Sequence, residues 1–345
     1  MQCALPMSKY PIITLAHGGG GKLTAELIDR VFRPHFKNDF LAQEHDGAVI
    51  ELQKGRLAFT TDSFVVSPIV FPGGDIGKLA VTGTINDLAM CGAKPLYMSC
   101  GFILEEGLKT ETLCQIVESM AKEAKAENIH IVTGDTKVVN QGKGDQIYIN
   151  TSGIGIIEHN QIIGPHSIRA GDQILLSSDV GRHGMAILSL REGLEFDSPI
   201  ESDCASVAPL VSLLLKADVP IHCLRDLTRG GLATALVELA ETSLLHFQID
   251  ETLVQIKPSV RGACEILGLD PLYVANEGCF VAFIPQTKSR LALEILKEHP
   301  LSKASAIIGN VLESNKSFGY VTAKNSLGTS RLMDRLTGEQ LPRIC

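Results

Sequence analysis

The sequence lacks several features, and each absence excludes a class of protein. No apolar run reaches transmembrane length, and residues 1–11 show neither the charged start nor the apolar stretch of a secretory signal. The 31 lysines and arginines are scattered along a chain of net charge −8, so no basic patch forms. Solenoid repeats, low-complexity blocks and heptads are also missing. We therefore expect a soluble, cytoplasmic protein that binds neither nucleic acid nor a membrane.

The cysteines follow no pattern of a disulfide framework or a structural zinc site. There are nine, an odd number, with no Cys-x-x-Cys pair and no histidine at finger spacing, which favours reduced thiols in a cytoplasm. The last residue of the sequence, Cys345, closes a segment that starts at Ser326. Gly328, Gly338 and Pro342 punctuate this segment and no apolar period crosses it, so we expect a mobile arm. Its cysteine is either incidental or a carrier of substrate.

The length of the chain predicts two domains. A chain of 345 residues exceeds one ordinary core, and its 45% hydrophobic residues are sufficient to fill two. The first half reads mainly as strands with helices between them, and glycine and proline punctuate residues 163–171. We expect a mixed α/β (α+β) fold with an N-terminal domain at 1–165, a C-terminal α+β domain at 166–325 and a flexible tail at 326–345.

A run of glycines near the start suits phosphate binding. It follows a short apolar run at residues 12–15, which we read as a strand, and it precedes a helical pattern. Bare backbone N–H groups and a helix N-terminus both favour anions. The spacing is not that of a Walker motif, so a flexible turn is the alternative. The residues concerned are Gly18, Gly19, Gly20, Gly21 and Lys22.

Several charged residues lie at the ends of predicted strands, where a side chain can reach a ligand. Predicted strands at residues 56–59 and 129–132 each lead into a Thr/Asp-rich segment. Turns are rich in aspartate, so no single one of these residues is specific. The candidates are Asp46, Asp62, Asp135, Lys137 and Asp226.

Two further carboxylates have apolar surroundings in the sequence. The helix predicted at about 75–91 places Asp87 on the same face as Ile76 and Leu79, where its burial requires an ion pair, a hydrogen-bonded site or a metal. Asn86 and Asp87 are therefore site candidates, with a satisfied buried aspartate as the alternative. Glu277 precedes an apolar strand that can raise its pKa, although it can also be a salt-bridge partner.

Nine short motifs occur in order along nearly the whole chain. They are His17-Gly-Gly-Gly-Gly21, Thr60-Thr-Asp-Ser63, Phe71-Pro-Gly-Gly74, Asn86-Asp-Leu-Ala89, Gly101-Phe-Ile-Leu-Glu105, Thr133-Gly-Asp-Thr-Lys137, Arg225-Asp-Leu-Thr-Arg-Gly-Gly231, Asn276-Glu-Gly278 and Pro342-Arg-Ile-Cys345. Together they resemble the HypE family of [NiFe]-hydrogenase maturation factors, which are carbamoyl dehydratases. The terminal Pro-Arg-Ile-Cys is the most specific piece. The wider family shares its fold with aminoimidazole ribonucleotide synthetase, selenophosphate synthetase and thiamine-monophosphate kinase.

The resemblance implies a homodimer and a reaction on the chain's own tail. Each N-terminal domain would contribute strands to a shared β-barrel flanked by helices, with ATP near the domain and subunit boundary. A carbamoyltransferase of the HypF type would load a carbamoyl group onto Cys345. ATP would then drive dehydration of that group to a thiocyanate, and the cyano group would pass to iron on a HypC–HypD type complex.

The resemblance also implies roles for the candidate residues. Lys137 matches a lysine suited to phosphate or a developing oxyanion, and Glu277 is the candidate base. The glycine loop with Lys22, Asn86 and Asp135 is expected to contact ATP. One position departs from the family pattern, because Cys279 stands where a basic residue is usual; the four glycines also replace the commoner Gly-Ser-Gly-Gly. The acids matching the family's Mg²⁺-ATP positions are Asp46, Asp62, Asp87 and Asp226.

Two other functions are compatible with these residues. The first is an ATP-dependent kinase or synthetase that acts on a free small molecule. The second is a non-catalytic scaffold whose tail docks maturation partners or a metal. Loss of product after removal of the tail residues would argue against the first, and nucleotide binding would argue against the second.

Overall fold

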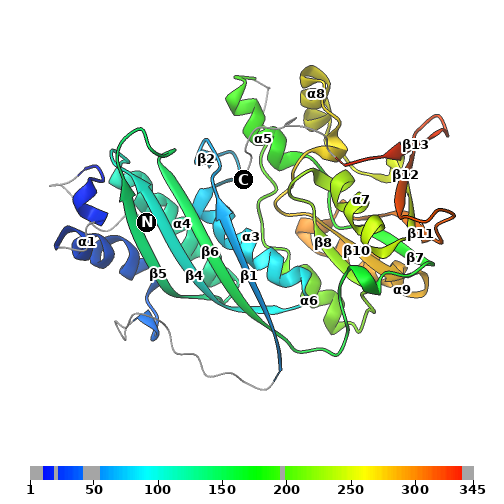
Figure 1. The fold of residues 1–345 in the computed structure, drawn as a ribbon, viewed down its shortest axis with the longest axis horizontal. Helices are drawn as coiled ribbons and strands as arrows, with labels where there is room; N and C mark the ends of the chain where they lie inside the picture. Colours follow the sequence, from blue (N-terminus) through cyan, green and yellow to red (C-terminus); the bar gives the residue numbers. More distant parts are fainter. Residues whose placement is uncertain (1–10, 19–21, 42–54, 195–198, 336–345) are drawn as a thin grey trace.

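The computed structural model describes residues 11–18, 22–41, 55–194 and 199–335, and the statements below concern these residues. They form two β-sheets with their helices, arranged as two domains side by side (Figure 1). The mixed α+β class predicted from the sequence is confirmed. None of the helices in these ranges is both long enough and apolar enough to cross a membrane.

The N-terminal domain is built on a four-stranded sheet of order β1-β6-β4-β5. Its neighbouring strands are antiparallel except for β4 and β5, which run parallel. The strands are β1 (Arg56–Phe64), β4 (Lys94–Glu105), β5 (His130–Val139) and β6 (Ile147–Ile157), and a separate small ribbon pairs β2 (Val70–Phe71) with β3 (Gly74–Asp75).

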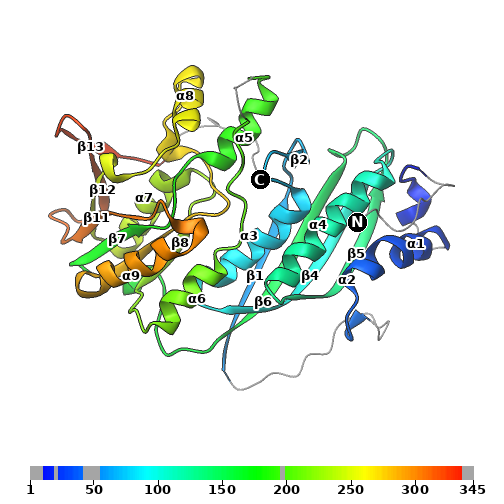
Figure 2. The ribbon, with the colours of Figure 1, turned by 180° about the vertical axis from the view of Figure 1, so that it is seen from behind.

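Two long helices cover one face of this sheet, α3 (Ile76–Met90) and α4 (Thr110–Ala126) (Figure 2). Asp75 caps α3, because its Oδ1 accepts hydrogen bonds from the backbone N–H groups of Gly77 and Lys78 at 2.8 and 2.9 Å. The predicted helix at 75–91 is thus confirmed. Beside them lie four short helices, η1 (Leu15–Gly18), α1 (Lys22–Leu27), η2 (Ile28–Phe32) and α2 (Arg33–Phe36).

One local prediction in this domain was wrong. The apolar run at 12–15 is not a strand: Ile12 makes one isolated bridge to Lys109, and the chain then turns into η1. Tertiary packing against the connection that precedes α4 overrides the local signal.

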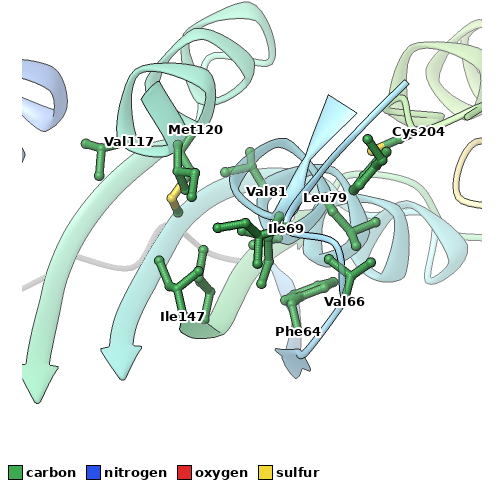
Figure 3. Packing of buried hydrophobic residues seen from close by; sticks show 14 of the residues in the cluster. Phe64, Val66, Ile69, Leu79, Val81, Val117, Met120, Ile147 and Cys204 are labelled. Atoms are coloured by element: carbon green, nitrogen blue, oxygen red, sulfur yellow. The ribbon is translucent and has the colours of Figure 1, made fainter. Parts of the chain in front are cut away.

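The core beneath α3 and α4 extends into the second domain. Phe64, Ile69, Leu79 and Met120 pack between the sheet and the helices, and Cys204 from the C-terminal domain joins the same cluster (Figure 3). Continuous apolar packing of this kind fixes the two domains relative to each other. A pocket between them therefore has a defined shape.

The opposite face of the four-stranded sheet has no covering layer in the described chain. Phe59 on β1 is 71% exposed, and Leu57 and Ile103 on the same face are also exposed. The sheet is open, so the part of one chain that the structure describes contains no closed barrel. An uncovered apolar face is typical of an interaction surface.

The C-terminal domain contains a seven-stranded sheet of order β13-β12-β9-β11-β7-β10-β8. Its pairs are antiparallel except β9 with β12. The strands are β7 (Asp172–Leu176), β8 (Cys223–Asp226), β9 (His246–Asp250), β10 (Phe280–Pro285), β11 (Ala306–Leu312), β12 (Tyr320–Lys324) and β13 (Ser330–Met333). We did not predict β9 or β13.

Helices pack on both faces of this sheet. The helix α7 packs on one face, while α6 and α9 pack on the other. The helices are α5 (Arg182–Arg191), α6 (Ala208–Lys216), α7 (Gly231–Ser243), α8 (Pro258–Leu267) and α9 (Gln286–Glu298), with short turns η4 (Pro165–Ser167), η5 (Glu251–Leu253), η6 (Pro271–Tyr273) and η7 (Pro300–Ser302).

The expected start of the mobile tail at residue 326 needs correction. Residues 330–333 form β13, which pairs with β12 through a turn at Gly328. The signal was misread because glycine punctuation marks a hairpin turn as well as a flexible segment. Residues 336–345, which include Cys345, lie outside the described part of the chain.

Candidate active site

A pocket of about 370 Å³ lies between the two domains. The N-terminal domain contributes Asp62 from β1 and Asp87 from α3, and the C-terminal domain contributes Asp226 from the end of β8 and Glu277 from the loop before β10. Four of the acids singled out in the sequence therefore meet in one place. Such a concave site with converging ionisable groups is typical of an active site.

Asp62 and Asp87 meet because a glycine lets α3 approach β1 closely. A side chain at Gly83 would crowd the ring of Phe64, at 3.0 Å from its Cβ, and would lie near the Asp62 carboxylate. Thr60, two residues before Asp62 on the same face of β1, donates a hydrogen bond of 2.7 Å to Asp87 Oδ2. The strand runs through Asp62 rather than ending before it, but strand alternation still directs the carboxylate toward the helix.

Burial dominates the electrostatics of these carboxylates. The pKa of Asp226 is raised to about 6, first by burial and then by the charges of Asp87 and Asp62. Burial also raises the pKa of Asp62 and of Asp87, although Arg229 and Arg225 respectively oppose the rise. Negative charge in this pocket is thus only partly compensated by the protein itself. A bound cation would compensate the remainder.

Glu277 occupies the buried end of the pocket, with 4% of its surface exposed. Its pKa is raised well above the usual value, first by burial and then by Asp226 and Asp203. The loop that presents it is held by Asp203, whose two carboxylate oxygens accept the backbone N–H groups of Glu277 and Gly278, each at 3.1 Å. The position of this carboxylate is therefore determined by hydrogen bonds of its own backbone.

Asn86 is buried, and its side-chain amide is hydrogen-bonded to the backbone of the C-terminal domain. Its Nδ2 donates to the carbonyl oxygens of Ala205 and Glu277 at 3.1 and 3.3 Å, and its Oδ1 accepts the N–H of Val207 at 2.8 Å. In the structure this amide joins α3 to the loop that carries Glu277, and the expected contact of Asn86 with ATP stays a prediction. The one-residue step from Asp87 rotates the side chain by about 100° around the helix, so Asp87 lines the pocket while Asn86 faces the other domain.

The glycine after Glu277 should not tolerate a side chain. A Cβ at Gly278 would collide with the backbone oxygen of Asp203, so Gly278→Ala is expected to destabilise the protein by about 1–3 kcal/mol. Gly262 inside α8 is the matched control, since open space surrounds it and alanine there should stabilise by about 0.5–1 kcal/mol. Urea unfolding of both variants measures the two changes. Equal stability of both would show that the loop is not tightly fixed.

Asp135 and Lys137 do not share the pocket. Both lie on β5, where strand register aligns Asp135 with Gly101 on β4, which in turn aligns with Asn150 on β6. Asn150 aligns with Ser63 on β1, so Asp135 and Lys137 lie on the same face of the sheet as Ser63, which is the open face. Asp62 is the neighbour of Ser63 along β1 and therefore lies on the opposite, helix-covered face. The two form an exposed ion pair of 2.7 Å, which lowers the pKa of Asp135.

Of the remaining site residues predicted from the sequence, the structure describes two, Gly18 and Lys22. Gly18 ends η1 and Lys22 begins α1, at the β5 side of the domain. Gly19, Gly20, Gly21, Asp46 and Cys345 lie outside the described residues.

Sequence analysis missed the basic residues of the pocket. Arg225 and Arg229 flank Asp226 in a motif that we quoted for its acid, and both line the pocket. Arg225 also pairs with Glu238 on α7 at 3.0 Å. Two arginines in a five-residue segment with an aspartate are a signal that could have identified them, because guanidinium groups suit phosphate.

Cys279 lies away from the polar part of the pocket. Its side chain belongs to the apolar core of the C-terminal domain, where its sulfur accepts a hydrogen bond of 3.6 Å from Ser177. Burial raises the pKa of this thiol to about 12, so it stays neutral. The chain accordingly has no charged group here to assist Glu277.

The acids suit a cation that also binds phosphate oxygens. Among the described residues, no three histidine, cysteine, aspartate or glutamate side chains converge closely enough to enclose a metal ion alone. Mg²⁺ typically takes one or two carboxylates together with waters and substrate phosphates. Asp62, Asp87 and Asp226 fit that pattern because they are clustered, half-buried and incompletely neutralised.

Without a bound cation, the charge of Asp226 should lower the free energy of unfolding of the protein. The pKa of Asp226 is about 6 in the folded chain, and its ordinary value is 3.8. Between these pH values the folded chain binds more protons than the unfolded chain, so the free energy of unfolding falls as the pH rises. Asp226→Asn should therefore stabilise the metal-free protein by roughly 1–3 kcal/mol at pH 7.5. The gain should vanish below about pH 4. Unfolding curves across this pH range measure it, and a gain that is independent of pH would contradict the assignment.

Comparisons with known proteins define the class of this chain. A family model described as AIR synthase related protein, N-terminal domain, matches residues 44–157, and its C-terminal counterpart matches residues 169–322. The fold and the interdomain pocket thus belong to a two-domain AIR synthase related protein. At 20% identity, a thiamine-monophosphate kinase from Stenotrophomonas maltophilia shares this fold with a TM-score of 0.65, covering 86% of this chain and 95% of that one.

Closer relatives identify the family. The chain is 48% identical to the carbamoyl dehydratase HypE of Azotobacter vinelandii, covering 96% of this chain and 97% of that one, and 48% identical to that of Cupriavidus necator, covering 96% and 95%. A solved structure of the hydrogenase maturation protein HypE in complex with ATP is 46% identical with a TM-score of 0.93, covering 96% and 99%. A HypE–HypF complex matches at 45% identity with a TM-score of 0.78, covering 90% and 99%. The chain belongs to the HypE family of carbamoyl dehydratases, as the motifs predicted.

Proposed function

We propose that this protein dehydrates an S-carbamoyl group on its own Cys345 to a thiocyanate at the expense of ATP, and so supplies a cyanide ligand for the iron of a [NiFe]-hydrogenase. The observation that carries the proposal is the interdomain pocket of Asp62, Asp87, Asp226 and Glu277 in a chain of this family. The ATP complex of a 46% identical HypE supports nucleotide use.

The chemistry requires activation of an oxygen and removal of two protons. An amide oxygen is a poor leaving group, so the γ-phosphoryl group of ATP is transferred to it and one N–H proton is lost. The C–O bond then breaks as the second N–H proton leaves, which gives a carbon–nitrogen triple bond, inorganic phosphate and ADP. The protein must therefore neutralise phosphate charge and accept protons from nitrogen.

We assign the first task to the aspartates with the two arginines, and the second to Glu277. Asp62, Asp87 and Asp226 would hold Mg²⁺, which supplies charge stabilisation to the phosphates when bound, and Asp46 is the fourth acid of the proposed set. The repulsion that raises the pKa of Glu277 comes partly from these same carboxylates. A cation that offsets their charge would lower the pKa of Glu277 and so favour the carboxylate that accepts a proton.

We further propose a homodimer in which the open sheet faces of two copies form a barrel. The uncovered apolar face that includes Phe59 supports this arrangement. Thr61 and Ser63, from the open face of the edge strand β1, line the pocket together with Asp62. In a barrel where β1 of one copy neighbours β5 of the other, Lys137 and Asp135 of the partner subunit would therefore approach the pocket along this edge. The family's phosphate-binding lysine is then supplied across the interface.

Mixed dimers test this arrangement. Homodimers of Asp87→Asn or of Lys137→Ala should both be inactive. A heterodimer with Asp87→Asn in one subunit and Lys137→Ala in the other keeps one complete cross-subunit site, which combines the acids of the second subunit with Lys137 of the first. We expect the purified heterodimer to recover about half of the wild-type rate, since one of its two sites is intact. Each homodimeric variant serves as the control. No recovery would place Lys137 and the acids in the same chain.

The proposed partners follow from the carrier role of the tail. A HypF-type carbamoyltransferase would load Cys345, in line with the HypE–HypF complex of a 45% identical chain. An iron-carrying HypC–HypD type complex would accept the cyano group. We place these exchanges in the cytoplasm, where a free thiol persists.

The mass of the C-terminal peptide tests the proposal. Carbamoylated protein is incubated with Mg²⁺-ATP and digested, and the peptide that ends in Cys345 is weighed before and after. We expect it to lose the mass of one water while ADP and phosphate form. ATP turnover with the carbamoyl mass unchanged would refute the dehydration.

A further inference from the structure

The pocket contains a fifth carboxylate, to which the proposed reaction gives no task. Glu238 on α7 lines the pocket, and its Oε2 lies 3.0 Å from Nη2 of Arg225 on β8. The two side chains are 38% and 48% exposed, so the pair lies at the mouth of the pocket, whereas Glu277 lies at its buried end. An ion pair of this exposure contributes little to stability, so its place in the site is the feature to explain.

The chain holds the two partners with different firmness. Glu238 lies inside α7 between Val237 and Leu239, which are both buried. Thr242, one turn further along the helix, donates a hydrogen bond of 2.9 Å to the backbone oxygen of Glu238. Arg225 lies on β8, an edge strand of its sheet, and its guanidinium ends a long side chain with many rotamers. The carboxylate therefore determines where the guanidinium lies.

The acids of the pocket compete with Glu238 for this guanidinium. Burial raises the pKa of Asp87 and of Asp226, and the charge of Arg225 opposes both rises. In the described part of the chain, however, the ion pair that Arg225 makes within 4.0 Å is with Glu238 and with neither aspartate. Because charges attract more strongly where water is excluded, a released Arg225 would move toward the aspartates. That move would withdraw the guanidinium from phosphate and occupy the carboxylates proposed to bind Mg²⁺.

We propose that Glu238 is a positioning residue that holds the guanidinium of Arg225 at the mouth of the pocket, away from the aspartates and available to the phosphates of ATP. This inference rests on the proposed function. A guanidinium has five N–H donors, and the pair with Glu238 is made through Nη2, so donors remain for phosphate oxygens. An arginine that is held in place beforehand also loses less freedom when phosphate binds.

Calorimetry with a non-hydrolysable ATP analogue measures this role without turnover. The analogue, in which an imido group replaces the β,γ-bridging oxygen, is titrated into the full-length protein with Mg²⁺. We expect Glu238→Gln to weaken binding about two- to fivefold, the size of a half-exposed ion pair. By charge alone, the loss of a carboxylate would instead strengthen the binding of an anion. The matched control is Glu294→Gln, an exposed glutamate on α9 on the other face of the sheet, which should bind the analogue as wild type does.

Two further results distinguish positioning from a general effect on folding. Arg225→Gln should weaken binding at least as much as Glu238→Gln, and adding Glu238→Gln to it should cause no further loss, because the guanidinium to be held is absent. The loss in Glu238→Gln alone should also shrink as Mg²⁺ is raised beyond the concentration that saturates the nucleotide, because the cation competes with Arg225 for the aspartates.

Three outcomes would overturn the role of Glu238. They are unchanged binding by Glu238→Gln, losses that add in the double variant, and a loss that does not depend on Mg²⁺. If the unaltered protein failed to bind the analogue, the proposed function would be refuted, and this inference with it.

Discussion

Replacing Cys345 with serine is expected to abolish thiocyanate formation while ATP still binds. A serine hydroxyl can hold a carbamoyl group only through oxygen, and dehydration of that group cannot give a carbon–sulfur bond. The loss should therefore be complete rather than partial. Detection of thiocyanate in the C-terminal peptide by mass, together with ATP binding by calorimetry, measures both halves of this expectation.

The matched control is Cys91→Ser at the end of α3. Cys91 is the exposed one among the cysteines that the structure describes, and it lies one helical turn from Asp87. Its replacement should leave the product yield unchanged. Thiocyanate from the Cys345→Ser protein, or its loss from the Cys91→Ser protein, would show that the cargo is carried by a different sulfur.

Deletion of residues 343–345 separates the main proposal from its alternatives. A kinase or synthetase for a free small molecule would keep its product yield without the tail. A scaffold would keep partner binding and show no nucleotide affinity. The proposed enzyme would keep ATP affinity and lose its product.

The second large effect is expected from Asp87. Its carboxylate accepts a hydrogen bond from Thr60 and lies in the pocket with Asp62 and Asp226. Asp87→Asn retains the shape and this hydrogen bond but removes a charge from the proposed Mg²⁺ site, so the dehydration rate should fall about 100-fold or more. Rates at saturating ATP, measured with melting curves, separate lost chemistry from lost folding.

Asp218→Asn is the control for this substitution. Asp218 is exposed and has a φ of 51°, a conformation that asparagine adopts readily. We expect its rate to match wild type. An Asp87→Asn protein with an unchanged rate would remove Asp87 from the site.

Local periodicity was sufficient to place some of these residues. The 3.6-residue period assigned Asp87 to the inner face of α3, and the apolar run after Glu277 indicated that this carboxylate would be buried. Asp62 was found although its strand is longer than expected, because alternation along a strand does not depend on where the strand ends.

Other features depend on pairing between distant segments, which local patterns do not contain. Lys137 and Asp135 occur in a motif like that of Asp62, but sheet register assigns them to the opposite face. Asn86 contacts the backbone of residues more than a hundred positions away. The strand β13 forms against β12 and its residues carry no long apolar alternation, so it was read as part of an arm.

The path of one oxygen atom tests the central claim most directly. The carbamoyl group on Cys345 is prepared with the heavy oxygen isotope, and one turnover is run with Mg²⁺-ATP in ordinary water. If the γ-phosphoryl group is transferred to the carboxamide, each inorganic phosphate released must carry one heavy oxygen and the thiocyanate none. Heavy oxygen found in water, with unlabelled phosphate, would contradict the account.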